Sequence, residues 1–265
     1  MNGILRNNLI FYNLVRKTKN KFKVFYFENF KNTFYDFHTI NSDKIVLHHH
    51  QGLGDAIICN GLVNYLAMNH FEKIILPVRK NIFNNLEFLY SNNPKVTLSE
   101  VSEESEIYSK FKELPILRVG FEKNYGKFNS SFYQQLKIPF KKSFELFNPP
   151  IDEVKEKLLL NHLFKEYKVT SNYILVHNTS SYGVVDLEFN TELPIIYIDK
   201  DTDIFNNVFY YSLAIKQATE IHCIDSSILH LVERIDTKAK LFFYPFKNSE
   251  QKSEKLELQK NWNII

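Results

Sequence analysis

The residues best suited to chemistry lie in a glycine turn, Gln51-Gly52-Leu53-Gly54-Asp55, which follows the apolar run Ile45–Leu47 and three histidines. Beyond the turn, apolar residues recur at close to helical spacing, at Ile57, Ile58, Leu62, Val63 and Leu66. This pattern predicts a strand, a turn and a helix. Because glycine lacks a Cβ atom, Gly52 and Gly54 let the backbone approach a ligand closely. The free N–H groups and the positive dipole end of the helix would point at that ligand.

Asp55 sits where the N-cap carboxylate of this helix would sit. Two effects act on its pKa in opposite directions, because burial raises it and the helix N-terminus lowers it. The sequence leaves open which effect is larger, and it also leaves open a turn and cap without any chemistry. A nicotinamide or flavin dehydrogenase is disfavoured, because the third glycine of the dinucleotide fingerprint is missing and the next glycine after Gly54 is Gly61.

Two further polar stretches each follow a predicted strand in the second half of the chain. The loop His177–Gly183 is rich in hydroxyl and N–H groups, which suit phosphate oxygens. In Asp225-Ser226-Ser227-Ile228-Leu229-His230, the serines would cap a helix and present N–H groups to a diphosphate. His230, one turn further on, would face the same crevice. N-capping alone also explains the Asp-Ser-Ser stretch, and this alternative stays open.

The Gly-Leu-Gly-Asp turn, the strand that ends in His177 before a Ser-rich loop, and the late Asp225-Ser-Ser-x-x-His motif together resemble glycosyltransferase family 9. The bacterial heptosyltransferases are its best-known members. The resemblance runs in element order from Lys44 to the C-terminus, and only these short motifs match at residue level. Ser227 stands where the family motif has glycine, and no lysine follows the Ser-rich loop before Asp199, where the family has one.

The resemblance implies an α/β, GT-B-like fold in which two Rossmann-like doubly wound domains face an interdomain cleft. It implies a metal-independent inverting glycosyltransferase that moves a hexosyl or heptosyl group from a nucleotide-diphosphate sugar to a glycan or glycolipid hydroxyl, without a further cofactor. Asp55 would be the general base that deprotonates the acceptor hydroxyl. Residues expected to contact substrates are Gly52, Gly54, His50, Gln51, Asn60, His177, Thr179, Ser180, Ser181, Asp225, Ser226, Ser227 and His230.

Strands alternate with helices in both halves, which by itself favours doubly wound α/β domains. The strands expected are Lys73–Val78, Val96–Leu98, Pro115–Val119, Tyr173–Val176, Ile195–Ile198, Glu220–Ile224 and Leu241–Tyr244, the last of which would close its sheet. The helices expected are Ile82–Tyr90, Phe132–Leu136, Ile151–Tyr167, Ile204–Ala218 and Ile228–Ile235, with a solvated loop at Ser99–Glu106. The proline pair Pro149-Pro150 predicts a boundary between an acceptor-side domain, 1–148, and a nucleotide-sugar-binding domain, 149–265. Within the first, 1–43 is a leader of uncertain structure.

Composition narrows the class of protein. The 265 residues have a formal net charge of +3, which is too small to argue for nucleic acid as a partner. Cys59 and Cys223 lie far apart in apolar runs, as buried thiols do in a reducing compartment, so we expect a cytoplasmic protein. The segment Ile4–Phe27 mixes aromatic and basic residues. Two interpretations stay open for it: peripheral contact with the inner face of a membrane, and packing on the first domain, which is favoured.

The His48-His49-His50 run does not predict a metal site, because alternate residues of a strand point to opposite faces and no cysteine or carboxylate cluster lies near. Two alternatives to transfer remain. One is a GT-B-fold nucleotide-sugar hydrolase or epimerase, and the other is a non-catalytic nucleotide-sugar or glycan-binding protein.

Overall fold

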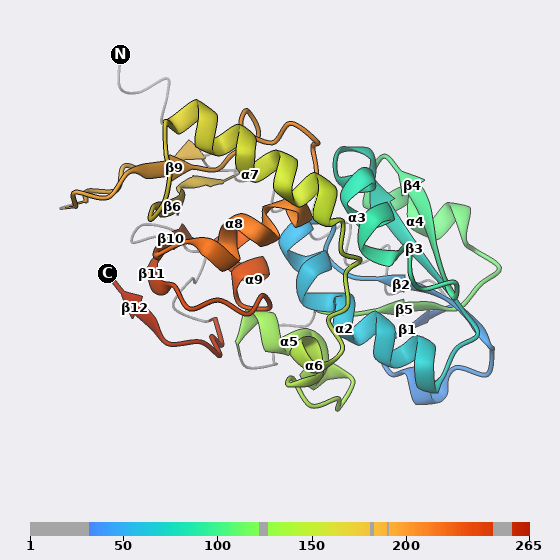
Figure 1. Ribbon diagram of the computed structural model, residues 1–265. Coiled ribbons are helices and arrows are strands. Elements are labelled where there is room, and N and C mark those ends of the chain that lie inside the picture. Colours follow the sequence, from blue (N-terminus) through green and yellow to red (C-terminus); the bar gives the residue numbers. More distant parts are fainter. Residues whose placement is uncertain (1–31, 122–126, 181–182, 190, 246–255) are drawn as a thin grey trace, which may run out of the picture.

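The computed structural model describes residues 32–121, 127–180, 183–189, 191–245 and 256–265. The fold is mixed α/β and contains two five-stranded sheets, in which all strand pairs are parallel, and a small antiparallel pair. Figure 1 shows the two sheets on opposite sides of the molecule, with helices α2 and α9 between them. The segment Ile4–Phe27 lies outside the described residues.

The first sheet has the strand order β1-β5-β2-β3-β4. Its strands are β1 (Thr33–Phe34), β2 (Lys44–His48), β3 (Lys73–Arg79), β4 (Val96–Val101) and β5 (Ile116–Arg118). The apolar run Ile45–Leu47 is almost fully buried on both faces, as parallel strands covered by helices on both sides require. Part of the predicted leader, 1–43, also joins the sheet, because β1 forms an edge strand beside β5.

Helices of the first half surround this sheet. They are η1 (Phe37–Thr39), α2 (Leu53–Asn69), η2 (Lys80–Ile82), α3 (Phe83–Tyr90), α4 (Glu104–Lys110), α5 (Phe128–Gln135) and α6 (Lys142–Glu145). Helix α2 lies at the centre, in contact with β3, α3, α5, α6 and α9. Because its neighbours enclose it on several sides, its residues from Ala56 to Val63 are all buried.

The second sheet has the order β12-β11-β10-β6-β9. Its strands are β6 (Ile174–His177), β9 (Ile195–Tyr197), β10 (Glu220–Ile224), β11 (Lys240–Tyr244) and β12 (Trp262–Ile264). Its helices are α7 (Glu153–Tyr167), η3 (Val208–Tyr211), α8 (Ser212–Gln217) and α9 (Ser227–Val232). Strands β7 (Thr179–Ser180) and β8 (Gly183–Val184) form the antiparallel pair after β6.

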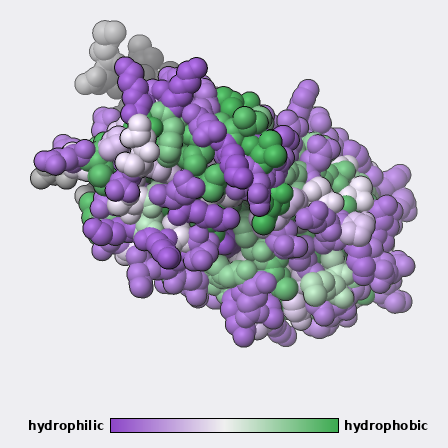
Figure 2. Space-filling view, viewed as in Figure 1, coloured by the Kyte–Doolittle hydropathy of each residue, from purple (hydrophilic) through white to green (hydrophobic). Residues whose placement is uncertain are grey.

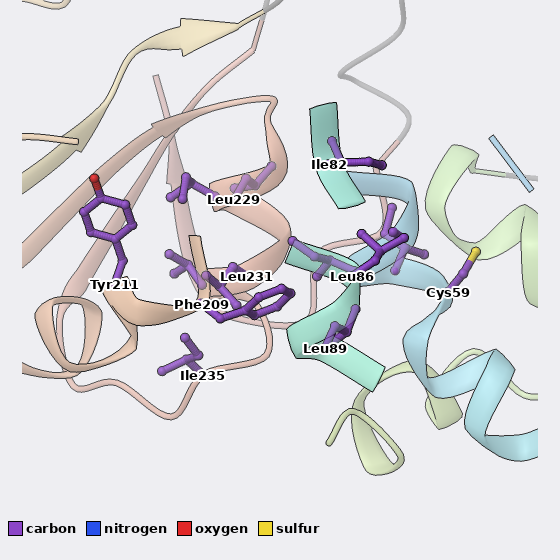
Figure 3. Packing of buried hydrophobic residues seen from close by; sticks show 14 of the residues in the cluster. Cys59, Ile82, Leu86, Leu89, Phe209, Tyr211, Leu229, Leu231 and Ile235 are labelled. Carbon is purple, nitrogen blue, oxygen red and sulfur yellow. The ribbon is translucent and has the colours of Figure 1, made fainter. Parts of the chain in front are cut away.

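The two halves share one buried hydrophobic cluster. Figure 3 shows Leu86 and Leu89 of α3 beside Phe209 and Leu231 of the second half, and α3 and η3 are in contact. The face in Figure 2 is mostly hydrophilic, with hydrophobic residues gathered near its centre. The boundary after Asn148 stays a prediction. At that point the backbone N–H of Asn148 donates to Asn60 Oδ1 at 3.1 Å, which fastens the connection to α2.

The prediction of a solvated loop at Ser99–Glu106 is wrong. Strand β4 continues to Val101 and α4 begins at Glu104. Acidic residues in the first turn of α4 complement the helix dipole, and Glu106 accepts a hydrogen bond from the backbone of Ser102 at 2.7 Å. The same acidic residues that indicated a loop therefore start a helix.

Several other element boundaries differ from those predicted, in both halves of the chain. The strand Glu220–Ile224 is confirmed at both ends, whereas the helix predicted from Ile204 is η3 and α8, which begin at Val208. In the first half, α5 begins at Phe128 rather than Phe132. Strand β11 does not close the sheet, because β12 pairs with its outer edge.

Among the described residues, no helix has the length and apolar character that crossing a membrane demands.

Strand β12 is held by the buried carboxylate of Glu233, directly after α9. Glu233 accepts hydrogen bonds from the backbone of Gln259 and Lys260 and, at 2.6 Å, from the indole of Trp262. We expect Glu233→Gln to lower the free energy of unfolding by roughly 2–3 kcal/mol, because charge-assisted bonds are lost in a buried place. Trp262 is the single tryptophan, so its fluorescence should shift to longer wavelength.

A matched control for this prediction is Glu153→Gln. Its carboxylate is 77% exposed and makes one surface ion pair, with Lys157 at 3.7 Å. Such pairs contribute little, so the change should stay within about 0.5 kcal/mol. Equal stability and equal Trp262 emission in both variants would contradict the role given to Glu233.

Candidate functional site

The two motifs that the sequence singled out meet in the structure. A Cβ atom on Gly54 would lie 3.1 Å from His230 Cδ2 and 3.6 Å from Ser227 Cα. The first turns of α2 and α9 are therefore almost in contact, and a side chain at position 54 would require the ring of His230 to move by a few tenths of an ångström. Both helices follow the carboxyl ends of parallel strands, β2 and β10, which is where ligands of open α/β sheets bind.

Asp55 is the third residue of α2 and not its N-cap, which is Gly52. Its Oδ2 accepts the backbone N–H of Gly52 at 3.2 Å, as a carboxylate at this position of a capping box does. The prediction of an N-cap is thus wrong by three residues, although the carboxylate still accepts a hydrogen bond from a free N–H group. A Cβ on Gly52 would lie 2.5 Å from that oxygen, so a side chain at this position would displace the Asp55 carboxylate from its hydrogen bond.

Burial decides the protonation of Asp55. Enclosure raises its pKa, and this outweighs the lowering by His50 and by the N–H groups of Gly52 and Asp55 itself. A carboxylate with a raised pKa is better suited to accept a proton from a hydroxyl group.

Asp225 is a second carboxylate at the same junction. Burial, and next the negative charge of Asp55, raise its pKa to about 6. Its Oδ1 lies 3.9 Å from Nε2 of His230. Ser226 is the N-cap of α9 and its hydroxyl accepts the N–H of Leu229 at 3.4 Å, so capping occupies this side chain. The electrostatic link between Asp225 and Asp55 joins residues from the two halves of the chain.

His230 is buried beside Asp225. Burial, and next the neighbouring Arg234, lower its pKa to about 3, so the ring is neutral at physiological pH. Its Nδ1 is buried and has no hydrogen-bond partner within the described part of the chain. A neutral imidazole can both donate and accept, which suits contact with a hydroxyl or a phosphate ester.

The three histidines after β2 point to different partners. His48 Nδ1 and the hydroxyl of Tyr108 hydrogen-bond at 2.9 Å, while His49 Nδ1 contacts the backbone oxygen of His50. His50 Nε2 donates to the carbonyl of Gly120 at 2.8 Å, and His50 is close enough to Asp55 to lower its pKa. Across the described residues, no three His, Cys, Asp or Glu side chains are grouped as metal ligands would be.

Gln51 and Asn60 have structural contacts. Gln51 Nε2 donates to the carbonyl of His49 at 3.2 Å, which shapes the turn before Gly52. Asn60 is fully buried, and its Oδ1 accepts from Asn64 and from the backbone of Asn148. Asn60 therefore anchors the connection between the halves.

The predicted Ser-rich loop lies on the same sheet edge as Asp225. His177 ends β6 and pairs in register with Cys223 of β10. Its Nδ1 donates to the carbonyl of Ile198 at 2.7 Å, so one ring nitrogen is already engaged. Thr179 and Ser180 form β7, a short strand rather than an open loop, and Ser181 lies outside the described residues.

Sequence reasoning missed Arg234, whose guanidinium lies next to this site. The available signal was a positively charged residue at helical spacing, one turn after His230, in the otherwise mostly apolar stretch Ile228–Ile235. An arginine at such a position reads as a solvated helix end. Only the packing of α9 against the first half places it inside.

The raised pKa of Asp225 predicts how stability depends on pH. A group whose pKa is higher in the folded than in the unfolded state loses stability as pH rises between the two values, here from about 4 to about 6. We expect Asp225→Asn to be more stable than the natural protein at pH 7, by roughly 1–2 kcal/mol after allowing for solvent screening. Near pH 3.5 the two proteins should be equally stable.

Thermal unfolding from pH 3.5 to pH 8 checks this prediction. Asp186→Asn is a suitable control, because Asp186 is exposed, and its curve should follow that of the natural protein. A constant difference between Asp225→Asn and the natural protein at all pH values would contradict the assignment.

Fold and site define an α/β protein in which two parallel sheets bring two carboxylates and a neutral histidine together. No protein-family model matches the chain, and no curated protein matches it. Among solved structures, it is similar to the glycosyl transferase family 9 protein from Veillonella parvula DSM 2008, with 10% identity and a TM-score of 0.42. The match covers 76% of this chain and 79% of the other. At this level, the similarity carries no assignment of family or function.

Proposed function

We propose that this protein is a glycosyltransferase that uses a nucleotide-diphosphate sugar, with a GT-B-like arrangement of an acceptor-side domain, 1–148, and a donor-side domain, 149–265. The observation that carries the proposal is the junction of α2 and α9. There Gly54 lies against the start of α9, and the adjacent Asp55, whose pKa is raised by burial, is close enough to Asp225 of the other half to raise the pKa of that residue. A base on one half and polar groups for the donor on the other are what transfer between two substrates requires.

In the proposed reaction, Asp55 removes the proton from an acceptor hydroxyl. The oxygen attacks the anomeric carbon from the face opposite the leaving group, and the bond to the nucleoside diphosphate breaks with inversion. The capped start of α9 at Ser226 and Ser227 offers N–H groups to the departing diphosphate. His230, which is neutral, would donate one further hydrogen bond. No metal enters this scheme, and the acceptor is a glycan or glycolipid.

A specific observation favours a second candidate, hydrolysis of a nucleotide sugar. The pKa of Asp225 is raised to about 6 beside Asp55, and burial raises the pKa of Asp55 as well, so both carboxyl groups hold a proton more readily than free ones do. Pairs of carboxyl groups with different protonation states act as acid and base in glycoside hydrolysis. In this case water would take the place of the acceptor hydroxyl. An epimerase uses the same donor without water or an acceptor.

The shared donor site is tested by thermal shift with UDP, GDP and ADP. Binding at 100 times the dissociation constant should stabilise the protein by about 2.7 kcal/mol. If none of the three raises the melting temperature, transfer, hydrolysis and passive nucleotide-sugar binding all fail together. The nucleotide sugar of the stabilising base is then incubated alone and with hydroxyl acceptors. Turnover only with an acceptor supports transfer, release of free sugar supports hydrolysis, and no turnover with tight binding supports a binding protein.

A further inference from the structure

Arg234 lies between the end of α9 and α6, and its hydrogen bonds join the two halves of the protein. Its Nη1 donates to the backbone oxygen of His230 at 2.8 Å, and its Nη2 donates to the hydroxyl of Ser143 in α6. Ser143 in turn donates to the carbonyl of Ile58 in α2 at 2.9 Å. One side chain therefore connects α9 to the helix that carries Asp55.

Arg234 also completes the end of α9. The helix ends at Val232, and the Nη1 group satisfies the carbonyl of His230 in its last turn. A positive charge at this end complements the helix dipole. The guanidinium lies 4.7 Å from the ring centre of Phe144 and 5.8 Å from that of Phe147, in the segment that leads to the second half. The orientation of a short helix is thus fixed from the first half.

Stability alone does not explain an arginine here. Burial lowers the pKa of Arg234 to about 10, which is the sign of a charge enclosed at a cost. Its Nε is buried and lacks a hydrogen-bond partner within the described residues, and none of their carboxylates forms an ion pair with it. The adjacent Glu233 is occupied by Gln259, Lys260 and Trp262. Hydrogen bonds offset only part of the cost of enclosing such a charge, so removal of the whole guanidinium need not lower the stability.

We infer that Arg234 is a positioning residue, which holds the end of α9 against α6. It thereby sets the separation between Asp55 on α2 and two residues of the other half, His230 on α9 and Asp225 directly before the N-cap of α9. The inference rests on the function proposed above, and it names the group that fixes the geometry between the two sides of that site. Arg234 acts on the site through the backbone oxygen of His230, to which it donates. The close contact of Gly54 with His230 is the part of the junction that this arrangement maintains.

The test uses Arg234→Met and Arg234→Lys in the full chain, with Lys238→Met as the control. Lys238 is exposed, lies in the same half and gives the same change in charge. We measure the melting temperature, kcat and KM with the nucleotide sugar that the natural protein turns over, and the titration of Asp225 by carboxyl ¹³C NMR. Methionine keeps the apolar contact with Phe144, whereas lysine keeps the charge and one donor.

For Arg234→Met we expect an unchanged or higher melting temperature, a kcat lowered about 10- to 100-fold with little change in KM, and an Asp225 midpoint below that of the natural protein. For Arg234→Lys, kcat and the Asp225 midpoint should lie between the values of Arg234→Met and those of the natural protein. For Lys238→Met, both should equal the values of the natural protein. Loss of folding in Arg234→Met with full activity in Arg234→Lys would overturn the inference, because Arg234 would then only stabilise the fold. An unchanged kcat and Asp225 midpoint in folded Arg234→Met would also overturn it.

The Asp225 titration separates this inference from the proposed function. If the natural protein turns over no nucleotide sugar, the proposed function fails, and kcat is no longer informative. The Asp225 midpoint in Arg234→Met still decides the inference, because it reports the burial of Asp225 and its distance from Asp55 without any substrate.

Discussion

Asp55→Asn is expected to lower turnover about 100- to 10,000-fold, with the nucleotide bound as tightly as before. Asparagine has the same shape and can still accept the N–H of Gly52, so the turn before α2 should stay intact. What it loses is the ability to take a proton. The measurement is kcat and KM for the sugar donor that the thermal-shift screen identifies, beside nucleotide affinity from the same screen.

The control for this experiment is Asp43→Asn. Asp43 is exposed and precedes β2, at the opposite end of the strand from the glycine turn. Its turnover should equal that of the natural protein. In the natural protein, the acid limb of the pH–rate profile should fall as pH drops through the raised pKa of Asp55, since the protonated carboxyl cannot act as a base. Normal turnover by Asp55→Asn would remove Asp55 as the base.

The largest effect on stability is expected for Gly61→Ala, in the middle of α2. A Cβ at this position would lie 2.3 Å from the carbonyl oxygen of Lys142 and 2.9 Å from Cα of Ser143. Both are backbone atoms of α6, so a change of side-chain rotamer cannot relieve the clash. Helix α6 must therefore move away from α2. Even after the gain from alanine's helix propensity, we expect a loss of about 3 kcal/mol in the free energy of unfolding. Chemical denaturation monitored by circular dichroism measures it.

Met68→Ala, in the last turn of the same helix, is the control. Its side chain is 68% exposed, so the free energy of unfolding should change by less than about 0.5 kcal/mol. Because α6 also carries Ser143, the partner of Arg234, any folded Gly61→Ala protein should have a lower Asp225 midpoint as well. Equal stability of Gly61→Ala and Met68→Ala would mean that α6 does not pack closely against α2.

Local patterns predicted most of the elements correctly. Runs such as Ile45–Leu47 are apolar because parallel strands are buried on both faces, and this can be read from neighbours in the chain. The errors arose where a local signal has two meanings. Acidic residues at 103–106 indicate a loop or the start of a helix, and only the burial of Ile107 and Tyr108 against the sheet decides for α4.

For the site, the sequence identified Gly54, Asp55, Asp225 and His230 as residues worth testing, from turn and capping chemistry together with the resemblance to glycosyltransferase family 9. It also selected Asn60, which the fold buries against the connection to the second half. It overlooked Arg234 and strand β12, because both depend on partners far away in the chain. Contacts of this kind leave little trace in the spacing of residues.

At the glycine turn, the sequence by itself determined that a strand, two glycines and a helix bearing Asp55 follow one another, since these features depend on adjacent residues. Only the tertiary structure decided that Gly54 lies against His230 and that burial outweighs the helix N-terminus in the pKa of Asp55. The reason is physical. The cost of enclosing a charge depends on everything packed around it, and those atoms come from segments that the chain brings together only when it folds.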